Sequence, residues 1–414
     1  MTQLGTKKSR KGCTNCKRRR VKCNEQAPCA NCSRRGEQCS LLGAPTPGTE
    51  LGPETSGLSP EEWIQDLELM HHYDRDTLLQ PLGIREDCQH LWRENIPREA
   101  IKHSFLMHGI LALSALHIVH TRPAEADKYL RLCDKHQTKA LEMFRTVLCT
   151  DITPGISTAL FALSSTISIL SMGRSCADAM SMPEPRYVSM EQVAELFLLT
   201  RGVRDLIHTC MEWVSAGPLG PMLDGHYSSD AHDVQLPVAV QKQFINLQYM
   251  LDECCAIEYR PECERALRRL EDIYRSVLSA STTMGEVETS QIWRWMLLAP
   301  CEFVTMIRAC FPPALILLAH FAAVSLTVRK AWYTSDWGHY VLTGISMVLY
   351  GSDMYSYLEW PMEQARSHMM ILTQPEEIDS VMNGSPPTAS RFPFDQTLSL
   401  EPGFDEAELG FVAF

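Results

Sequence analysis

Apolar residues recur at helical spacing through most of the chain beyond its first sixty residues. Ser59-Pro60-Glu61-Glu62 predicts a helix start, with Ser as the N-cap, Pro at the first helical position and Glu three residues after the cap. Trp63, Ile64, Leu67 and Met70 follow at helical spacing. Similar patterns predict further helices near residues 99–120, 123–149, 155–172, 190–215, 238–280, 288–309, 313–333 and 336–358.

No stretch alternates apolar and polar residues over the length of a strand. Residues 61–372 are therefore predicted to form a large all-α domain, and about 300 residues are enough to enclose a cavity. The apolar runs Pro313–Val328 and Phe105–Val119 both contain histidine, and the longer one has 16 residues. A membrane-spanning helix needs about 20 residues, so no membrane span is expected.

Composition changes on both sides of this domain. Residues 1–12 are basic and expected to be flexible, and residues 40–60 contain eight Gly or Pro without a heptad pattern. Residues 40–60 are therefore predicted to form a disordered linker and no coiled coil. Residues 373–414 hold eight acidic residues, one Arg, five Pro and five Phe, which predicts a disordered acidic tail. Aromatic residues among acids make this tail a candidate activation segment that binds a coactivator.

The stretch of residues 13–39 holds six cysteines, spaced C-x2-C-x6-C twice: Cys13, Cys16, Cys23, Cys29, Cys32 and Cys39. Two equal half-patterns predict two similar half-sites related by a pseudo-twofold. A structural zinc takes four thiolates, so one zinc would leave two cysteines over and two separate zincs would need eight. Six cysteines serve two zinc ions only if two sulfurs bridge both metals. A disulfide framework is the alternative, but nothing at the N-terminus resembles a signal peptide and ten more cysteines are scattered through the chain.

This spacing resembles the fungal binuclear zinc cluster, and all six cysteines match that family's pattern. The resemblance implies a small zinc-stabilised two-helix DNA-binding module that holds two zinc ions. It also implies the ligand roles: Cys13 and Cys29 bridge the metals, Cys16 and Cys23 complete one zinc, and Cys32 and Cys39 complete the other.

Basic residues fill the space between the second and third cysteines: Lys17, Arg18, Arg19, Arg20 and Lys22. A short helix near the first C-x2-C pair would expose them; Arg can bind guanine O6 and N7 with two hydrogen bonds, and either cation can hold a phosphate. The resemblance implies that Arg19 and Arg20 reach base edges in a CGG-like triplet of double-stranded DNA, although the family usually has lysine there. Arg34 and Arg35 are better placed for phosphates. A nuclear import signal or a solvated face is the alternative for the basic run.

The distribution of charge supports a DNA-binding head on an acidic body. The net charge of the chain is −12, yet residues 1–42 hold 11 Lys or Arg against 2 acids, and the remainder holds 27 against 48. This asymmetry is expected when a small module contacts DNA and the body stays off it. The ten cysteines outside the cluster lack metal-ligand spacing and are expected to be reduced, buried thiols, as in a reducing compartment such as the nucleus.

The helical domain resembles the regulatory domain of fungal zinc-cluster factors of the sterol uptake control protein type. The resemblance lies in residues 69–73, 105–118, 199–204, 311–320 and 360–366. It implies an all-α domain that binds a sterol or another hydrophobic small molecule and controls exposure of the activator, but it assigns no pocket residues. His103, His108, His117 and His120 lie among apolar residues and are interpreted as core or rim histidines.

The leading hypothesis is a nuclear, sequence-specific transcription factor of RNA polymerase II genes, an activator of a secondary-metabolite gene cluster or of sterol and lipid genes. One alternative is a repressor or corepressor-docking protein with the same DNA-binding module. The other is an enzyme fused to that module. The chain contains no G-x-S-x-G, H-E-x-x-H or phosphate-binding Gly loop, so it is not expected to be an enzyme.

Overall fold

The computed structural model divides the chain into two compact units, Met1–Trp63 and Ile64–Phe414. We call residues 11–41 the zinc module and the second unit, together with the start of its first helix, the helical body. The structure describes residues 11–41 except 38, 59–75, 88–149, 152–223, 234–283, 289–327 and 331–367 except 335.

The zinc module consists of two short helices, α1 (Thr14–Arg18) and α2 (Ala30–Ser33), joined by loops. Each helix begins directly after the first cysteine of a C-x2-C pair. The thiols of Cys13 and Cys29 act as N-caps and accept the backbone N–H of Cys16 and Cys32. Because the N-cap takes up an otherwise unpaired N–H, the residue that starts each helix is also a predicted metal ligand.

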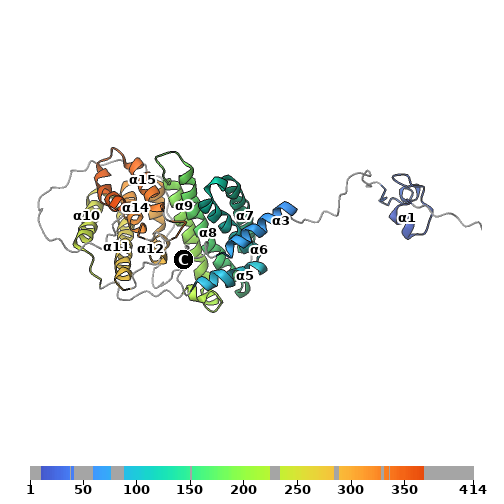
Figure 1. Cartoon of the computed structure of the whole chain (residues 1–414), viewed down its shortest axis with the longest axis horizontal. Helices are drawn as coiled ribbons and strands as arrows, with labels where there is room; N and C mark the ends of the chain where they lie inside the picture. Colours follow the sequence, from blue (N-terminus) through green and yellow to red (C-terminus); the bar gives the residue numbers. More distant parts are fainter. Residues whose placement is uncertain are drawn as a thin grey trace, which may run out of the picture. The chain divides into compact units, whose positions relative to one another are not determined.

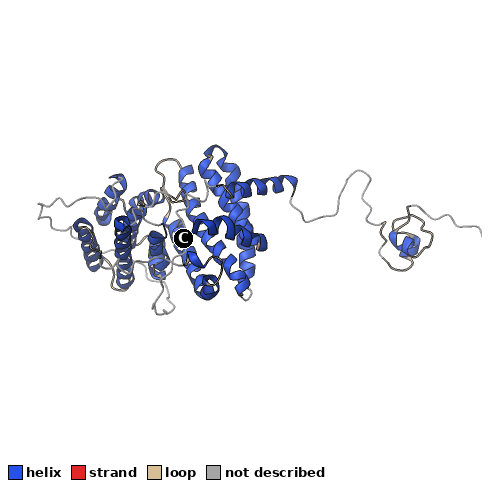
Figure 2. Cartoon of the chain, turned by 60° about the horizontal axis from the view of Figure 1, so that its bottom comes forward, coloured by secondary structure: helices blue, strands red, loops and turns tan. Residues whose placement is uncertain are grey.

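The helical body contains helices and loops, and no strand occurs within the described ranges (Figure 2). Its first half comprises α3 (Pro60–Tyr73), the π-helical turn η3 (Leu91–Asn95), α5 (Ile96–Lys102), α6 (Ser104–Thr121), the 3-10 turn η4 (Pro123–Glu125), α7 (Ala126–Leu148) and α8 (Pro154–Ser181).

The second half begins with α9 and ends with α16. It comprises α9 (Met190–Ser215), the 3-10 turn η5 (Gly220–Met222), α10 (Val238–Cys254), α11 (Arg260–Thr283), α12 (Thr289–Leu298), α13 (Cys301–Arg308), α14 (Pro312–Ser325), α15 (Trp337–Leu349), the 3-10 helix η7 (Asp353–Leu358) and α16 (Glu359–Ser367).

Helices α8 and α9 pack side by side in the middle of the body, with α5 to α7 on one side and α10 to α15 on the other (Figure 1). The core lies around helices that are apolar on all sides. In α14 every residue from Pro313 to Ser325 is buried, and α6 is buried from Gly109 to Val119. A helix without a polar face is stable in water only when neighbours cover it, which explains the central positions of α6, α8 and α14.

The expected fold class is confirmed for the zinc module and for the all-α body. The predicted helix start at Ser59 is also confirmed: Ser59 N–H donates to Glu62 Oε2 at 3.0 Å, and Glu62 N–H donates to Ser59 Oγ at 3.2 Å. Of the predicted disordered linker, residues 40, 41, 59 and 60 are described; its remainder and the acidic tail lie outside the described residues.

Three predicted helices are each two helices in the structure: the segment 99–120 covers α5 and α6, which are separated at His103, and in the other two a proline lies at the start of the second helix. The segment 238–280 divides into α10 and α11, with Pro261 in the first turn of α11, and the segment 288–309 divides at Pro300. Proline lacks the N–H of an interior helical bond and clashes with the preceding turn, so it is found at helix starts. The apolar pattern continues across both breaks, which is why periodicity alone missed them.

Among the residues that the structure describes, two helices are long and apolar enough to cross a membrane by composition: Ser104–Thr121 and Pro154–Ser181. The bent pair α13 and α14, with an angle of 100° between them, would make a third span if it counted as one. The sequence-based expectation of no span overlooked the second helix, which is 28 residues long. Inside the body, 67% and 83% of the respective apolar windows are buried. Packing among helices therefore accounts for their composition, and the absence of a membrane span stays a prediction.

Glycine allows a close approach at Gly344 of α15, where a Cβ atom would run into the backbone carbonyl oxygen of Val188. Gly202 in α9 is different, because nothing lies within 4 Å of its Cβ position. Gly344→Ala should therefore destabilise the body by about 1–3 kcal/mol through overpacking. Gly202→Ala should stabilise it by up to about 1 kcal/mol, because Ala is the better helix former. Thermal unfolding of the full chain measures both, and shifts of the same sign would contradict this account.

Candidate metal centre and nucleic-acid interface

All six cysteines of the zinc module are buried, with at most 3% of each residue exposed. Three pairs of sulfur atoms lie 3.6 Å apart: Cys13 with Cys29, Cys13 with Cys32, and Cys16 with Cys29. Two thiolates on one tetrahedral zinc, each about 2.3 Å from the metal, lie about 3.8 Å apart. The separations therefore fit shared zinc coordination across the two halves.

Four of these sulfurs, those of Cys13, Cys16, Cys29 and Cys32, lie within 4.8 Å of one another. In the described part of the chain this is the one such group of three or more His, Cys, Asp or Glu side chains. Cys23 and Cys39 are outside that group, but each sulfur accepts a backbone N–H from the first cysteine of its own half. The two N–H···S distances are 3.4 Å from Cys13 and 3.3 Å from Cys29.

These backbone contacts also affect the acidity of the last cysteine in each half. The N–H groups of Cys29 and Leu41 lower the pKa of Cys39 to about 7. The N–H groups of Cys13 and Glu25 lower the pKa of Cys23. Hydrogen bonds to a thiolate favour the charged form, and the thiolate is the form that binds zinc.

The two halves are related by an offset of 16 residues, and their side-chain contacts follow the same relation. The Asn15 amide donates to Cys32 Sγ at 3.9 Å, and the equivalent Asn31 amide donates to Cys16 Sγ at 3.9 Å. Each asparagine thus supports a sulfur of the opposite half. Nothing in the cysteine spacing indicated these two residues, although their equivalent positions inside C-T-N-C and C-A-N-C could have drawn attention to them.

Both helices end in the same hydrogen-bonded turn. In the first half Val21 N–H donates to Cys16 O and Arg20 N–H to Lys17 O, both at 3.1 Å. The second half repeats this pattern with Glu37 and Gly36 as donors. This is the Schellman motif, in which one residue takes the left-handed conformation.

That residue is Gly36 in the second half, with φ +64°, but Arg20 in the first half, with φ +58°. Glycine adopts this conformation without a steric penalty, whereas a residue with a Cβ pays about 1 kcal/mol or more. An arginine at such a position is therefore a candidate functional residue.

The predicted DNA-contact residues lie mostly at the surface of the module. Lys17, Arg18, Arg20 and Lys22, and in the second half Arg34 and Arg35, are exposed. Arg19 differs from them, because its side chain is 22% exposed and forms an ion pair with Glu37. No pattern in the sequence indicated this contact, which joins residues 18 positions apart in different halves.

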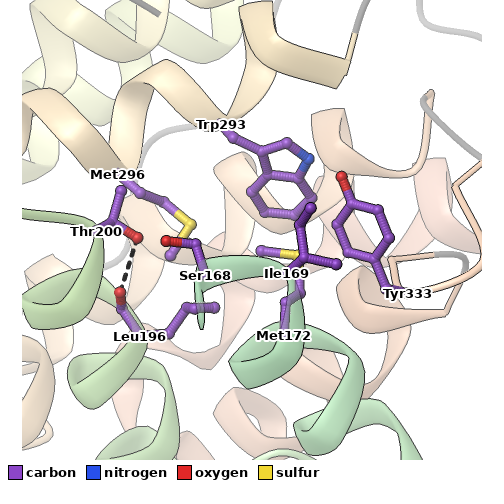
Figure 3. A pocket seen from close by; sticks show the side chains of 8 residues that line it. All are labelled: Ser168, Ile169, Met172, Leu196, Thr200, Trp293, Met296 and Tyr333. Atoms are coloured by element: carbon purple, nitrogen blue, oxygen red, sulfur yellow. Dashed lines mark hydrogen bonds between the residues drawn. The ribbon is translucent and has the colours of Figure 1, made fainter. Parts of the chain in front are cut away.

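The helical body contains a narrow pocket between α8, α9 and α12 (Figure 3). Its unfilled space is about 290 Å³, part of which is open to solvent. Its lining is mainly apolar: Ser168, Ile169, Met172, Leu196, Thr200, Trp293, Met296 and Tyr333. The indole N–H of Trp293 is buried and has no hydrogen-bond partner.

Histidines of the body are paired inside the helix bundle. His72 Nε2 lies 2.8 Å from His117 Nδ1, and His108 Nδ1 lies 2.9 Å from His136 Nδ1. Burial lowers the pKa of His72 to about 4 and that of His117 to about 3; Arg122 and Arg75 add to the shift of His72, and the neighbouring His72 and His120 add to that of His117. Both rings are therefore neutral near pH 7, which agrees with the interpretation of His117 as a core residue.

Each unit contains a segment that matches a known family. Residues 11–47 match the fungal Zn(2)-Cys(6) binuclear cluster domain, and residues 68–197 match the fungal specific transcription factor domain. The chain is 33% identical over 230 residues to the Zn(2)-C6 fungal-type transcription factor afumD of Aspergillus fumigatus. The aligned residues are 51% of this chain and 57% of that protein.

Two further relatives are similar over different lengths. A Zn(2)-C6 fungal-type transcription factor of Gibberella zeae is 23% identical over 320 residues, 75% of this chain and 64% of that protein. Sterol uptake control protein 2 of Candida albicans is 52% identical over 94 residues, 22% of this chain and 12% of that protein. The chain thus spans less than two thirds of the length of these relatives.

The chain therefore carries two segments that match domains of fungal Zn2Cys6 transcription factors. The binuclear cluster holds two zinc ions, as the cysteine count predicted. Both matched domains belong to transcription factors and not to enzymes.

Arg20 allows fold and function to be separated at one position. Arg20→Gly should stabilise the module by about 1 kcal/mol, because glycine relieves the left-handed backbone, while DNA binding weakens. Arg18→Gly is the matched control: it removes the same side chain inside α1, where glycine should destabilise by up to about 1 kcal/mol. Zinc retention against a chelator and DNA binding of the full chain measure the two effects. Weaker zinc retention in Arg20→Gly would contradict the argument.

Proposed function

We propose that this protein is a nuclear regulator of transcription that binds specific DNA sequences through its zinc module. The observation that carries the proposal is a buried group of cysteine thiols that holds exposed basic side chains at the end of α1. Residues 11–41 have no apolar core apart from the cysteines and Leu41, so zinc binding supplies the free energy of folding. The basic residues are thereby fixed on a rigid support.

In this proposal all six cysteines are zinc ligands, and Cys13 and Cys29 bridge the two metals. The sulfur distances support these roles. Cys13 Sγ contacts Cys32 Sγ, and Cys29 Sγ contacts Cys16 Sγ, so the first cysteine of each half lies against the second cysteine of the other half. A sulfur shared by both zinc ions must lie close to ligands of both halves.

Arg19 and Arg20 are proposed to contact base edges in a CGG-like triplet. Lys17, Arg18 and Lys22, with Arg34 and Arg35, are proposed to contact phosphates. The domain division is part of the same proposal: 1–12 basic arm, 13–39 zinc cluster, 40–60 linker, 61–372 regulatory body and 373–414 activation segment.

We infer an activator, because aromatic residues lie among acids in the tail. The secondary-metabolite or sterol and lipid genes remain the proposed targets; sterol uptake control is part of the name of one relative. A repressor with the same DNA-binding module is the second candidate. The pocket of the helical body is the proposed site for a hydrophobic ligand, whose hydroxyl group would find a donor in Trp293. The room that a water-sized probe can enter is only about 10 Å³, so the helices would have to move apart to admit such a ligand.

Substitution of single arginines tests the division between base and phosphate contacts. Arg19→Ala or Arg20→Ala should cost about 1–3 kcal/mol at a CGG-containing site and relax its sequence preference. Arg34→Ala or Arg35→Ala should weaken binding to all sequences alike and lower the salt slope by about 1. Fluorescence anisotropy titrations over a range of salt concentrations measure both quantities. If all four variants weakened every DNA sequence equally, the assigned base contacts would be wrong.

The acidic tail is tested in a reporter assay. Phe411→Ala combined with Phe414→Ala should strongly reduce activation while DNA binding persists, because buried Phe stabilises a complex by about 1.5–3 kcal/mol. Neutralising Asp405, Glu406 and Glu408 should do less, since exposed charge pairs contribute about 0–1 kcal/mol. Residues 373–414 fused to an unrelated DNA-binding domain should activate. A silent fusion alongside an active full-length protein would assign activation to the helical body.

A further inference from the structure

The ion pair between Arg19 and Glu37 connects the two halves of the zinc module. Arg19 Nη2 meets Glu37 Oε2, and the two side chains are 22% and 38% exposed. Arg19 caps the C-terminal end of α1, and Glu37 lies two residues before the last cysteine. Among the predicted DNA-contact residues, all of which lie in the described part of the module, Arg19 is the one that forms an ion pair.

The backbone holds both partners in place. Arg19 N–H donates to Asn15 O at 3.1 Å, and Glu37 N–H donates to Cys32 O at 3.0 Å. Each residue thus belongs to the hydrogen-bonded end of a short helix whose start is a predicted zinc ligand. The backbone positions of Arg19 and Glu37 are therefore set by the metal cluster, which keeps the two side chains within reach of each other.

The Glu37 carboxylate is expected to lower the affinity of the module for DNA. The first 42 residues contain 11 Lys or Arg and two acids, Glu25 and Glu37. A carboxylate beside the DNA-binding side chains repels phosphate and weakens attraction to every sequence alike. The Glu25 carboxylate accepts the backbone N–H of Lys11 at 3.0 Å, whereas Glu37 pairs with the side chain of Arg19.

The guanidinium has five N–H donors in a planar fork. A carboxylate on one edge fixes the plane of the group and leaves donors on the other edges for guanine O6 and N7. We propose that Glu37 is a positioning residue that orients Arg19 for base recognition, so that it increases sequence discrimination and lowers general DNA affinity. The inference rests on the proposed DNA-binding function.

The test compares Glu37→Ala, Glu37→Gln and the matched control Glu25→Ala in the zinc-loaded full chain. Fluorescence anisotropy gives dissociation constants for a CGG duplex, for duplexes with each base of the triplet changed, and for unrelated DNA. Mass spectrometry confirms two zinc ions in every variant, which excludes misfolding as the cause.

Glu37→Ala should reduce discrimination between CGG and its variants by about fivefold or more, the low end of what a bidentate contact to guanine contributes. Glu25→Ala should leave discrimination unchanged. Both should tighten binding to unrelated DNA to the same extent, because each removes one negative charge. Glu37→Gln keeps an acceptor for the Arg19 N–H and should retain most of the discrimination.

Two results would overturn the inference. Unchanged discrimination in Glu37→Ala would make Glu37 an ordinary surface acid, and increased discrimination would mean that the pair withholds Arg19 from DNA. Failure of the proposed function is distinguishable from both, because the unmodified protein would then show no preference for any DNA sequence in the same titrations.

Discussion

The close approach of the Cys13 and Cys29 thiols is the constraint on which the zinc module depends. Their sulfurs lie 3.6 Å apart, and each also caps the helix that follows it. One contact therefore brings the two halves together and fixes the start of both helices. A module of this size cannot bury enough apolar surface to fold by itself, so the metals replace the missing core.

On this nearly symmetric support the two halves carry different side chains. The left-handed position holds Arg20 in one half and Gly36 in the other, and the next position holds Val21 and Glu37. The second half thus accepts the conformation without strain and supplies an acid, while the first half carries the arginines. In the proposed function the first half contacts bases. The second half holds Arg19 in place through Glu37 and contacts phosphates.

The helical body is stabilised in a different way, by burial of helices that lack a polar face. α14 and α6 lie inside the bundle, and α8 packs against both α6 and α9. Where the backbone of α15 approaches Val188 closely, the residue is Gly344, which has no side chain to obstruct the contact. The narrow pocket between α8, α9 and α12 has room of only about 10 Å³ for a water-sized probe. A hydrophobic ligand would therefore require the helices to move.

The sequence by itself determined the cysteine cluster, the number of zinc ions, the position of the basic side chains and the all-α character of the body. These features depend on ligand count and on local periodicity, which are properties of neighbouring residues. The cap at Ser59 belongs here too, since its partner Glu62 is three residues away.

Only the tertiary structure decided which residues meet across the chain. The pairing of Arg19 with Glu37, the support of Cys32 by Asn15 and of Cys16 by Asn31, and the contact of His72 with His117 join positions 15 to 45 residues apart. The pattern of apolar residues also could not locate the breaks before Pro261 and at Pro300, because both flanking helices bury the same kind of surface. Local sequence fixes the conformation of a segment, but the partners of a polar side chain depend on how the whole chain closes around its metals and its core.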